Sequence, residues 1–133
     1  MVQAAKGRKA LSRSERTPGR RSACPVASTL DIVGDRWTLL VIRDLARGKQ
    51  RFVEFSASPE RIPTNILSDR LKRLEQEGIV TSRLYSQHPP RSEYNLTPKG
   101  EDLAPVIRAI VDWGLKHIPG THVLPLPERA RPR

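Results

Sequence analysis

The sequence has a single cysteine, no long apolar segment and few aromatic residues, and each shortage excludes a class of protein. With Cys24 as its only cysteine, the chain can form no internal disulfide and no cysteine-based metal site. No apolar run approaches the roughly 18 residues of a membrane-spanning helix. A secretory signal requires an apolar segment after a basic N-terminus, and this sequence has no such segment. We therefore expect a cytoplasmic protein that does not enter a membrane.

Residues for catalysis or metal binding are also scarce. The sequence has no nucleophile elbow, no Gly-rich phosphate loop and no paired carboxylates in a plausible cleft, so we expect no enzyme and no cofactor. His88, His117 and His122 are predicted on a loop, a helix end and a tail, without acidic partners at ligand spacing, so we expect no metal site. Aromatic residues make up 5% of the chain, which is too few to suggest a stacking platform for single-stranded nucleic acid.

Positive charge is abundant, and most of it lies at the N-terminus. The net charge is +10, yet residues 1–23 alone hold seven Lys or Arg and one Glu. Residues 24–117 hold 14 basic and 12 acidic side chains, so the central region is close to balanced. A basic tail binds any polyanion, so the net charge does not by itself identify a DNA-binding fold.

Composition divides the chain of 133 residues into one domain and two tails. Residues 1–22 have almost no large apolar groups and are predicted to be a disordered basic tail. Residues 119–133 carry four prolines and three arginines and are predicted to be an extended tail. The domain between them spans residues 23–118.

The first half of this domain has a helical pattern with recognisable start and stop signals. Pro25 suits the first turn of a helix that stops at Gly34. Asp35 can cap a second helix, from Arg36 to about Ala46. A short helix over Phe52–Ser56 is expected to direct both of its phenylalanines inward.

The second half combines a long amphipathic helix, a hairpin and a final helix. Leucines at positions 67, 71 and 74 place one apolar stripe on a helix spanning Thr64–Glu77. Two strands are predicted next, Ile79–Tyr85 and Ser92–Leu96, separated by a six-residue loop whose prolines interrupt pairing. A helix from Pro98 to about His117 should be kinked by Pro105, which cannot donate to the carbonyl four residues back.

This order of elements predicts a mainly α winged helix-turn-helix protein with a small β-hairpin wing. The C-terminal helix carries more apolar surface than one such domain needs for its own core, which predicts a dimer. With its leucine stripe inward, the helix Thr64–Glu77 presents Asn65, Asp69 and Lys72 outward, and such side chains can read base edges in a major groove. A polar outer face is also what any solvated amphipathic helix shows. The hairpin and the preceding short helix favour the DNA-binding interpretation.

The same region, about Cys24–His117, resembles the HxlR-type transcriptional regulators, which are relatives of the MarR regulators. The matching segments are Cys24-Pro25-Val26, Leu30-Asp31-Ile32-Val33-Gly34-Asp35-Arg36-Trp37-Thr38, Arg51-Phe52-x-Glu54-Phe55, Asn65-x-Leu67-Ser68-x-Arg70-Leu71-x-x-Leu74-Glu75-x-x-Gly78, Pro90-x-x-x-Tyr94-x-Leu96-Thr97-x-x-Gly100 and Trp113-Gly114. The chain departs from the family pattern at Phe55 and at Pro63, and the second difference leaves the start of the recognition helix open by a residue or two. The resemblance implies a homodimer that binds double-stranded DNA as a transcriptional regulator, on a palindromic operator.

Candidate site residues follow from both arguments. The DNA-binding candidates are Thr64, Asn65, Ser68, Asp69, Arg70, Lys72, Arg73, His88 and Arg91, and the dimer-interface candidates are Val26, Leu30, Leu103, Val106, Ile110 and Trp113. Cys24 precedes a helix start, where the helix dipole favours a thiolate, and some members of the family sense oxidants through a cysteine there. A structural role for this thiol is the alternative. A basic RNA-binding or ribosome-associated module with the same fold is the rival function, and the sequence leaves open whether a small effector binds.

Overall fold

The computed structural model describes residues 21–123 and divides the chain into two compact units, one ending at Gly34 and one beginning at Asp35. The described part of the first unit contains helix α1 (Pro25–Val33), with Pro25 in its first turn and Gly34 after its end. The Gly34 N–H donates to the Leu30 carbonyl at 2.8 Å, so the predicted start and stop of this helix are confirmed. Most of the predicted N-terminal tail, and residues 124–133 of the C-terminal tail, lie outside the described residues.

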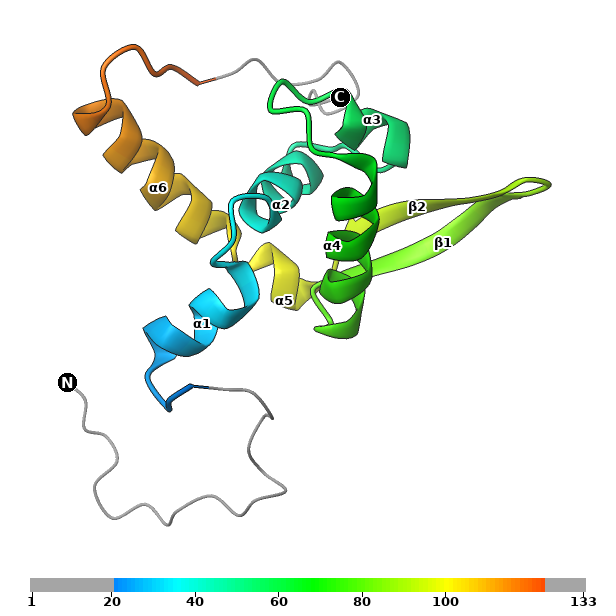
Figure 1. The fold of residues 1–133 in the computed structure, drawn as a ribbon, viewed down its shortest axis with the longest axis horizontal. Coiled ribbons are helices and arrows are strands. Elements are labelled where there is room, and N and C mark those ends of the chain that lie inside the picture. Colours follow the sequence, from blue (N-terminus) through cyan, green and yellow to red (C-terminus); the bar gives the residue numbers. More distant parts are fainter. Residues whose placement is uncertain (1–20, 124–133) are drawn as a thin grey trace. The chain divides into compact units, whose positions relative to one another are not determined.

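The second unit contains five helices and one hairpin among its described residues (Figure 1). In chain order they are α2 (Thr38–Ala46), α3 (Phe52–Ser56), α4 (Thr64–Gln76), β1 (Val80–Gln87), β2 (Pro90–Leu96), α5 (Pro98–Glu101) and α6 (Ala104–His117). Helices α3 and α4 with the turn between them form the helix-turn-helix, and the hairpin projects beside α4 as the wing. The predicted winged helix-turn-helix fold is therefore confirmed.

Helix α2 starts two residues later than predicted. The Asp35 carboxylate accepts hydrogen bonds from the backbone N–H groups of Trp37 and Thr38, at 3.0 and 3.2 Å. Asp35 thus satisfies the free donors at the helix start, as expected of a capping residue. Regular helix nevertheless begins at Thr38 rather than at Arg36, and the Val41 N–H donates to the Trp37 carbonyl at 3.1 Å.

The core of the second unit forms where α2, α3 and α4 meet the base of the hairpin. The three leucines of α4 are at most 1% exposed, so the predicted stripe is buried as expected. Phe55 is equally buried, whereas Phe52 is only half-buried, so one of the two phenylalanines of α3 reaches the core fully. The remaining core side chains of this unit are Val41, Ile42, Leu45, Ile79 and Val80.

The hairpin is longer than predicted, and the expected six-residue loop is wrong. Strands β1 and β2 pair from Val80↔Leu96 out to Gln87↔Pro90, with an irregularity in register between Leu84 and Ser86. Only His88 and Pro89 remain in the turn. The prolines do not interrupt pairing because one lies in the turn and the other is the first residue of β2, where a missing N–H removes no ladder bond.

The predicted single C-terminal helix is two helices. Helix α5 is capped by Thr97, whose hydroxyl accepts from the Gly100 N–H at 3.1 Å. Pro105 lies in the first turn of α6 and starts a new helix instead of kinking a continuous one, because its missing N–H is not needed there. No helix in residues 21–123 is both long and apolar enough to cross a membrane.

Candidate nucleic-acid interface

The outer side of α4 is a continuous polar surface. Thr64, Asn65, Ser68, Asp69 and Lys72 are all exposed, while the leucines on the opposite side are buried. Because 3.6 residues make one turn, these five side chains share one face of the helix. The structure therefore brings together most of the candidates predicted on this helix, anchored from behind by the core.

Two arginines predicted on this helix have partners within the chain. Arg70 is half-buried and forms an ion pair with Asp35 at 2.9 Å, and it also bonds the carboxylate of Asp69. Arg73 is half-buried on the flank of the polar face and also interacts within the chain. Lys72 is therefore the exposed cation at the centre of the α4 face, and Arg70 serves to tie α4 to the start of α2.

The Asp35 carboxylate connects these two helices electrostatically. Burial alone would raise its pKa, but hydrogen bonds from Thr38, Arg70 and the Trp37 N–H outweigh burial and lower the pKa from 3.8 to about 2. The group is thus charged at neutral pH, and the charge faces the Arg70 guanidinium. This ion pair fixes the orientation of α4 relative to α2 at one point.

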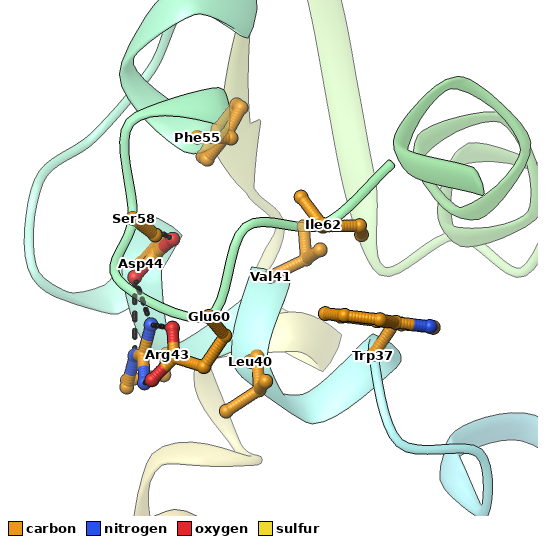
Figure 2. A pocket seen from close by; sticks show the side chains of 9 residues that line it. All are labelled: Trp37, Leu40, Val41, Arg43, Asp44, Phe55, Ser58, Glu60 and Ile62. Atoms are coloured by element: carbon orange, nitrogen blue, oxygen red, sulfur yellow. Dashed lines mark hydrogen bonds and ion pairs between the residues drawn. The ribbon is translucent and has the colours of Figure 1, made fainter. Parts of the chain in front are cut away.

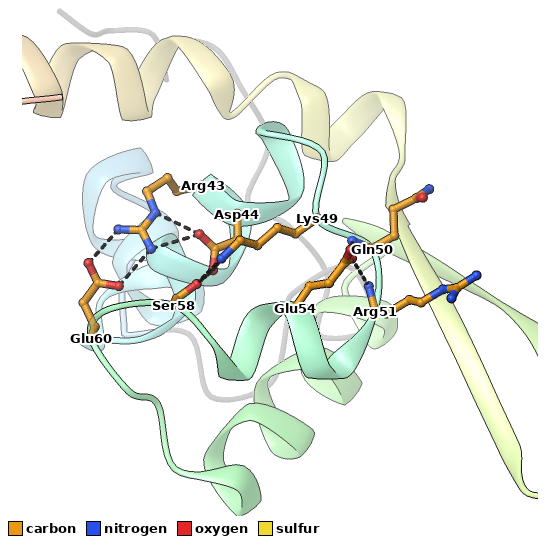
Figure 3. A network of polar contacts seen from close by, with 8 residues as sticks. All are labelled: Arg43, Asp44, Lys49, Gln50, Arg51, Glu54, Ser58 and Glu60. Atoms are coloured by element: carbon orange, nitrogen blue, oxygen red, sulfur yellow. Dashed lines mark hydrogen bonds and ion pairs between the residues drawn. The ribbon is translucent and has the colours of Figure 1, made fainter. Parts of the chain in front are cut away.

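The turn between α3 and α4 is fixed to α2 by a second polar network (Figure 3). Arg43 reaches both carboxylate oxygens of Glu60, at 2.8 and 2.9 Å, and also bonds Asp44. The Ser58 hydroxyl donates to the buried carboxylate of Asp44. The bond to Glu60 raises the pKa of Arg43, and the same bond lowers the pKa of Glu60. Both groups are therefore charged, and a two-pronged arginine pair of this kind also fixes geometry.

Apolar packing holds the same turn. Trp37, Val41, Phe55 and Ile62 line a cavity of only about 10 Å³ between the turn and α2, as Figure 2 shows. A space of that volume is at most the size of one water molecule, so the turn packs closely on α2. Pro63 then precedes the first residue of α4, Thr64. The start of the recognition helix, which the sequence left open, is thus settled at Thr64.

The base of the wing is organised around Glu93. This carboxylate accepts from Arg51 at 2.9 Å and from Arg83 at 3.1 Å, and these hydrogen bonds lower its pKa. The Arg51 guanidinium also lies over the ring of Tyr85, 3.9 Å from its centroid. Backbone bonding adds to the contact, since the Tyr94 N–H donates to the Gln50 carbonyl at 2.8 Å. The wing is thus attached to the segment that precedes α3.

The tip of the wing carries the remaining DNA-binding candidates. His88 lies in the two-residue turn, and Arg91 pairs in register with Ser86 one step along the strands. Both side chains are exposed. Arg83, nearer the base, is bonded to Glu93, which leaves Arg91 as the tip cation with no acidic partner among residues 21–123.

The residues predicted for the dimer interface are mostly exposed. In α6, Val106, Ile110 and Trp113 are 41%, 51% and 60% exposed, and no residue of that helix is buried. Leu103, just before it, is half-buried. Val26 and Leu30 of α1 are exposed in their own unit, as is Cys24 at the N-terminal end of that helix. Within the described residues, no group of three or more histidine, cysteine or acidic side chains could hold a metal ion.

Sequence reasoning missed the residues that support the interface. Arg43 and Glu60 are not among the predicted residues, and Arg51 is named only as part of the family resemblance, because charged residues on helices and loops are usually solvated. Asp35 was recognised as a cap, but its pairing with Arg70, 35 positions later, was not foreseen. No sequence pattern indicates that a helix-capping aspartate will contact an arginine so far away in the chain. Only the folded structure could therefore reveal this pair.

Comparison with known proteins identifies related chains. The family model of HxlR-like helix-turn-helix proteins matches residues 32–122. The HTH-type transcriptional regulator YdeP of Bacillus subtilis, itself uncharacterized, is 42% identical over 94 residues, which are 71% of this chain and 73% of YdeP.

Two solved structures extend the comparison. The crystal structure of PA1607 superposes with a TM-score of 0.69 at 35% identity, covering 88% of this chain and 82% of PA1607. The redox regulator HypR in its reduced form superposes with a TM-score of 0.64 at 36% identity, covering 70% of this chain and 92% of HypR. The residues that the family model matches include α3, α4 and the wing.

Proposed function

The chain belongs to the HxlR-like helix-turn-helix family of transcriptional regulators, and from that premise we propose that it binds a specific double-stranded DNA sequence as a homodimer. The observation that carries the proposal is the outer face of α4, which is polar and exposed while three leucines anchor the helix from behind. A helix enters a major groove only with such a free face and a rigid support.

In this proposal the centre of the α4 face reads bases. Asn65 and Lys72 can bond purine edges, and Thr64 and Ser68 can reach either a base or a phosphate. Arg70 and Asp69 bond each other, and Arg70 also bonds Asp35, so these two orient α4 and shape the edge of the face. Arg73 extends the flank toward the phosphate backbone.

The wing supplies contacts beside the groove. His88 and Arg91 at its tip are exposed, and a cation there suits a phosphate or a minor groove. The ion pairs at Glu93 hold the hairpin at its base, so the position of the tip is defined relative to α3. Phosphate contacts of this kind fix the position of the protein along the duplex, and they add affinity that decreases as the salt concentration rises.

Dimerisation supplies the second half-site. Exposed apolar side chains of α6 and α1, together with Leu103, form the proposed interface: Val26, Leu30, Leu103, Val106, Ile110 and Trp113. Apolar surface of this kind marks a contact with another chain. Two recognition helices about 34 Å apart then match half-sites one helical turn apart on one side of the duplex, which predicts a palindromic operator.

Selection of DNA from a random pool by the full-length protein tests this function. We expect a palindromic consensus, and a mobility shift in which the selected duplex binds at least 1,000-fold more tightly than random DNA, as specific regulators do. The same RNA sequence, at equal charge, is the control for the rival function. Equal affinity for RNA and duplex DNA would overturn the proposal and favour an RNA-binding module.

A second candidate function is regulation through oxidation of Cys24. Two observations favour it: the thiol is exposed at the start of α1, and the fold is similar to that of HypR, whose structure is known in reduced and oxidised forms. With one cysteine per chain, oxidation joins Cys24 to a second subunit or to a small thiol, and the oxidant takes up two electrons and two protons.

Diamide treatment of wild type and Cys24→Ser tests this regulation. We expect diamide to change operator affinity only in wild type, because a disulfide at the start of α1 would alter the spacing of the two recognition helices. The Cys24→Ser variant is the matched control, since it keeps a small polar side chain. The same response in both proteins, or none in either, would assign the thiol a structural role.

A further inference from the structure

A cavity of about 690 Å³ lies between α2, α6 and the turn that follows α6. It is far larger than the space behind the helix-turn-helix, and its volume falls within the roughly 300–1,000 Å³ of small-molecule sites. The α4 face and the wing contribute none of its lining residues. The proposed DNA interface therefore does not account for this cavity.

The chain after α6 turns back to build one wall of the cavity. Gly120 adopts a φ of 85°, which favours glycine, and reverses the direction of the chain. The Thr121 hydroxyl then bonds the carbonyl oxygens of Gly114 and Ile118, at 3.0 and 2.8 Å. These two bonds hold His122 and Val123 at the rim. The wall is thus a built feature of the fold.

The floor of the cavity is apolar and comes mostly from one side of α6. Ile107, Val111 and Leu115 line it at four-residue spacing, with Ala46 from α2 opposite. The side chains proposed for the dimer interface, such as Val106 and Ile110, lie on a different side of the same helix, because each residue advances by 100°. Helix α6 therefore has one apolar side for a partner chain and another that faces the cavity.

The rim carries an excess of positive charge. Arg43, Arg47 and Arg108 line the cavity, and among residues 21–123 Glu60 is the one acidic residue in its lining. Glu60 is already bonded at both oxygens by Arg43. Arg108 is exposed and has no acidic partner among the residues that the structure describes. An apolar floor below a cationic rim complements a molecule with an apolar body and a negative group.

We propose that this cavity binds a small organic anion with an aromatic or branched aliphatic body, whose acidic group pairs with Arg108. The apolar body lies over Ile107 and Val111, and Val123 closes over it. Paired charges next to an apolar floor give such a site its selectivity, because a neutral or cationic molecule of the same shape leaves the arginine unpaired. The site is separate from the proposed DNA interface, which lies on α4 and the wing.

Three naphthalene probes of equal shape and different charge test the site. Binding of 2-naphthoate, 2-naphthalenemethanol and 2-naphthylmethylamine to the full-length protein is measured by calorimetry without DNA. The anion is expected to bind at least tenfold more tightly than the neutral probe, and the amine more weakly still. Amide signals of residues 107–115 and 121–123 should shift in the NMR spectrum with the anion. Equal affinity for the three probes, or shifts confined to other regions, would overturn the proposal.

Two variants locate the binding, and one controls for charge. Arg108→Gln should weaken 2-naphthoate binding about tenfold without affecting the neutral probe. Lys116→Gln is the control, because it removes a cation from α6 outside the cavity lining. Gly114→Leu should abolish binding of all three probes, since a Cβ at Gly114 meets no atom within 4 Å and the longer side chain can occupy the cavity.

Sedimentation separates this site from a contact between copies of the chain. The NMR amide signals of residues 107–115 are also recorded while the protein is diluted until sedimentation shows only monomer. If dilution shifts the same signals that 2-naphthoate shifts, a second copy of the chain occupies the cavity and the proposal is wrong. If the wild-type oligomer is unchanged by 2-naphthoate while binding persists, the small-molecule site stands. Because no DNA is present in these measurements, failure of this site and failure of the proposed operator binding are distinguishable.

Discussion

Helices α4 and α6 have similar lengths, 13 and 14 residues, but opposite relations to the core. Helix α4 buries three leucines completely and presents its polar side to solvent. Helix α6 buries no residue, and its apolar side chains, Trp113 among them, remain exposed. The polar face of the first helix suits DNA, and the apolar surface of the second suits another chain and a ligand.

The difference shows that amphipathicity alone does not indicate what a helix contacts. Both helices have apolar residues at helical spacing, and a stripe of that kind ordinarily predicts a core-facing side. The core of the second unit is already filled by α2, α3, α4 and the start of β1. Little core remains for α6 to cover, so its apolar side chains are available for contacts outside the subunit.

The largest expected effect concerns the anchoring side of α4. Leu71→Ala should lower the free energy of unfolding by about 3 kcal/mol, because it leaves a cavity in a fully packed core. The loss should not depend on protein concentration. Chemical denaturation at two protein concentrations measures it.

The matched variant on α6 is Ile110→Ala. Its effect on stability should be small in the monomer and should grow with protein concentration, as expected for a residue that stabilises a dimer. If Leu71→Ala and Ile110→Ala behaved alike at all concentrations, the contrast between the two helices would not hold.

The second prediction is that a charge on the apolar side of α6 separates the subunits. Ile110→Glu should raise the dimer dissociation constant about 100-fold or more, because a buried unpaired carboxylate is costly at an interface. Sedimentation should then show a species of 15.0 kDa, the mass of one chain. Asp112→Asn on the polar side of the same helix is the control and should remain dimeric. A dimeric Ile110→Glu would place the interface elsewhere.

The third prediction concerns the polar side of α4. Lys72→Ala should weaken binding to the selected operator by about 1–3 kcal/mol and relax one position of the consensus, if this side chain reads a base. Lys116→Ala on α6 removes the same charge away from the proposed groove contact and serves as the control. A mobility shift with selected and random duplexes measures both. Equal losses for the two variants would indicate that Lys72 acts only through general charge.

The smallest expected effect is electrostatic, at the Asp35–Arg70 pair. Asp35→Asn should reduce stability by about 0.5–1 kcal/mol, since both side chains of the pair are partly exposed to solvent, which screens their attraction. Because folding lowers the pKa of Asp35 to about 2, its charge stabilises the fold fully above its unfolded pKa of roughly 4. The difference between wild type and Asp35→Asn should therefore shrink as pH falls from about 4 toward 2.

A control for this pH effect is Asp69→Asn, which removes the other carboxylate that Arg70 bonds. Asp69 is more exposed, so its loss should change stability less. Urea unfolding at a series of acidic pH values compares the two variants with wild type. A difference between wild type and Asp35→Asn that stayed constant through this range would mean that the Asp35 charge does not contribute to stability.

The sequence by itself determined the elements that depend on local signals. Pro25 and Gly34 marked the bounds of α1, and the spacing of three leucines marked α4, because caps and helical periodicity are set within a few residues. The winged helix-turn-helix fold followed from the order of these elements and from the family resemblance. The outer face of α4 was predictable for the same reason, since the inward stripe fixes the outward side.

Only the tertiary structure decided what depends on contacts between distant residues. It paired Arg70 with Asp35, 35 positions away in the chain, and it placed Pro90 at the first position of β2, where the hairpin could continue. It also divided the last helix at Pro105 and left α6 beside a cavity with a cationic rim. Such features arise when separate elements pack together, and sequence spacing carries no information about which charged groups then come within hydrogen-bonding distance.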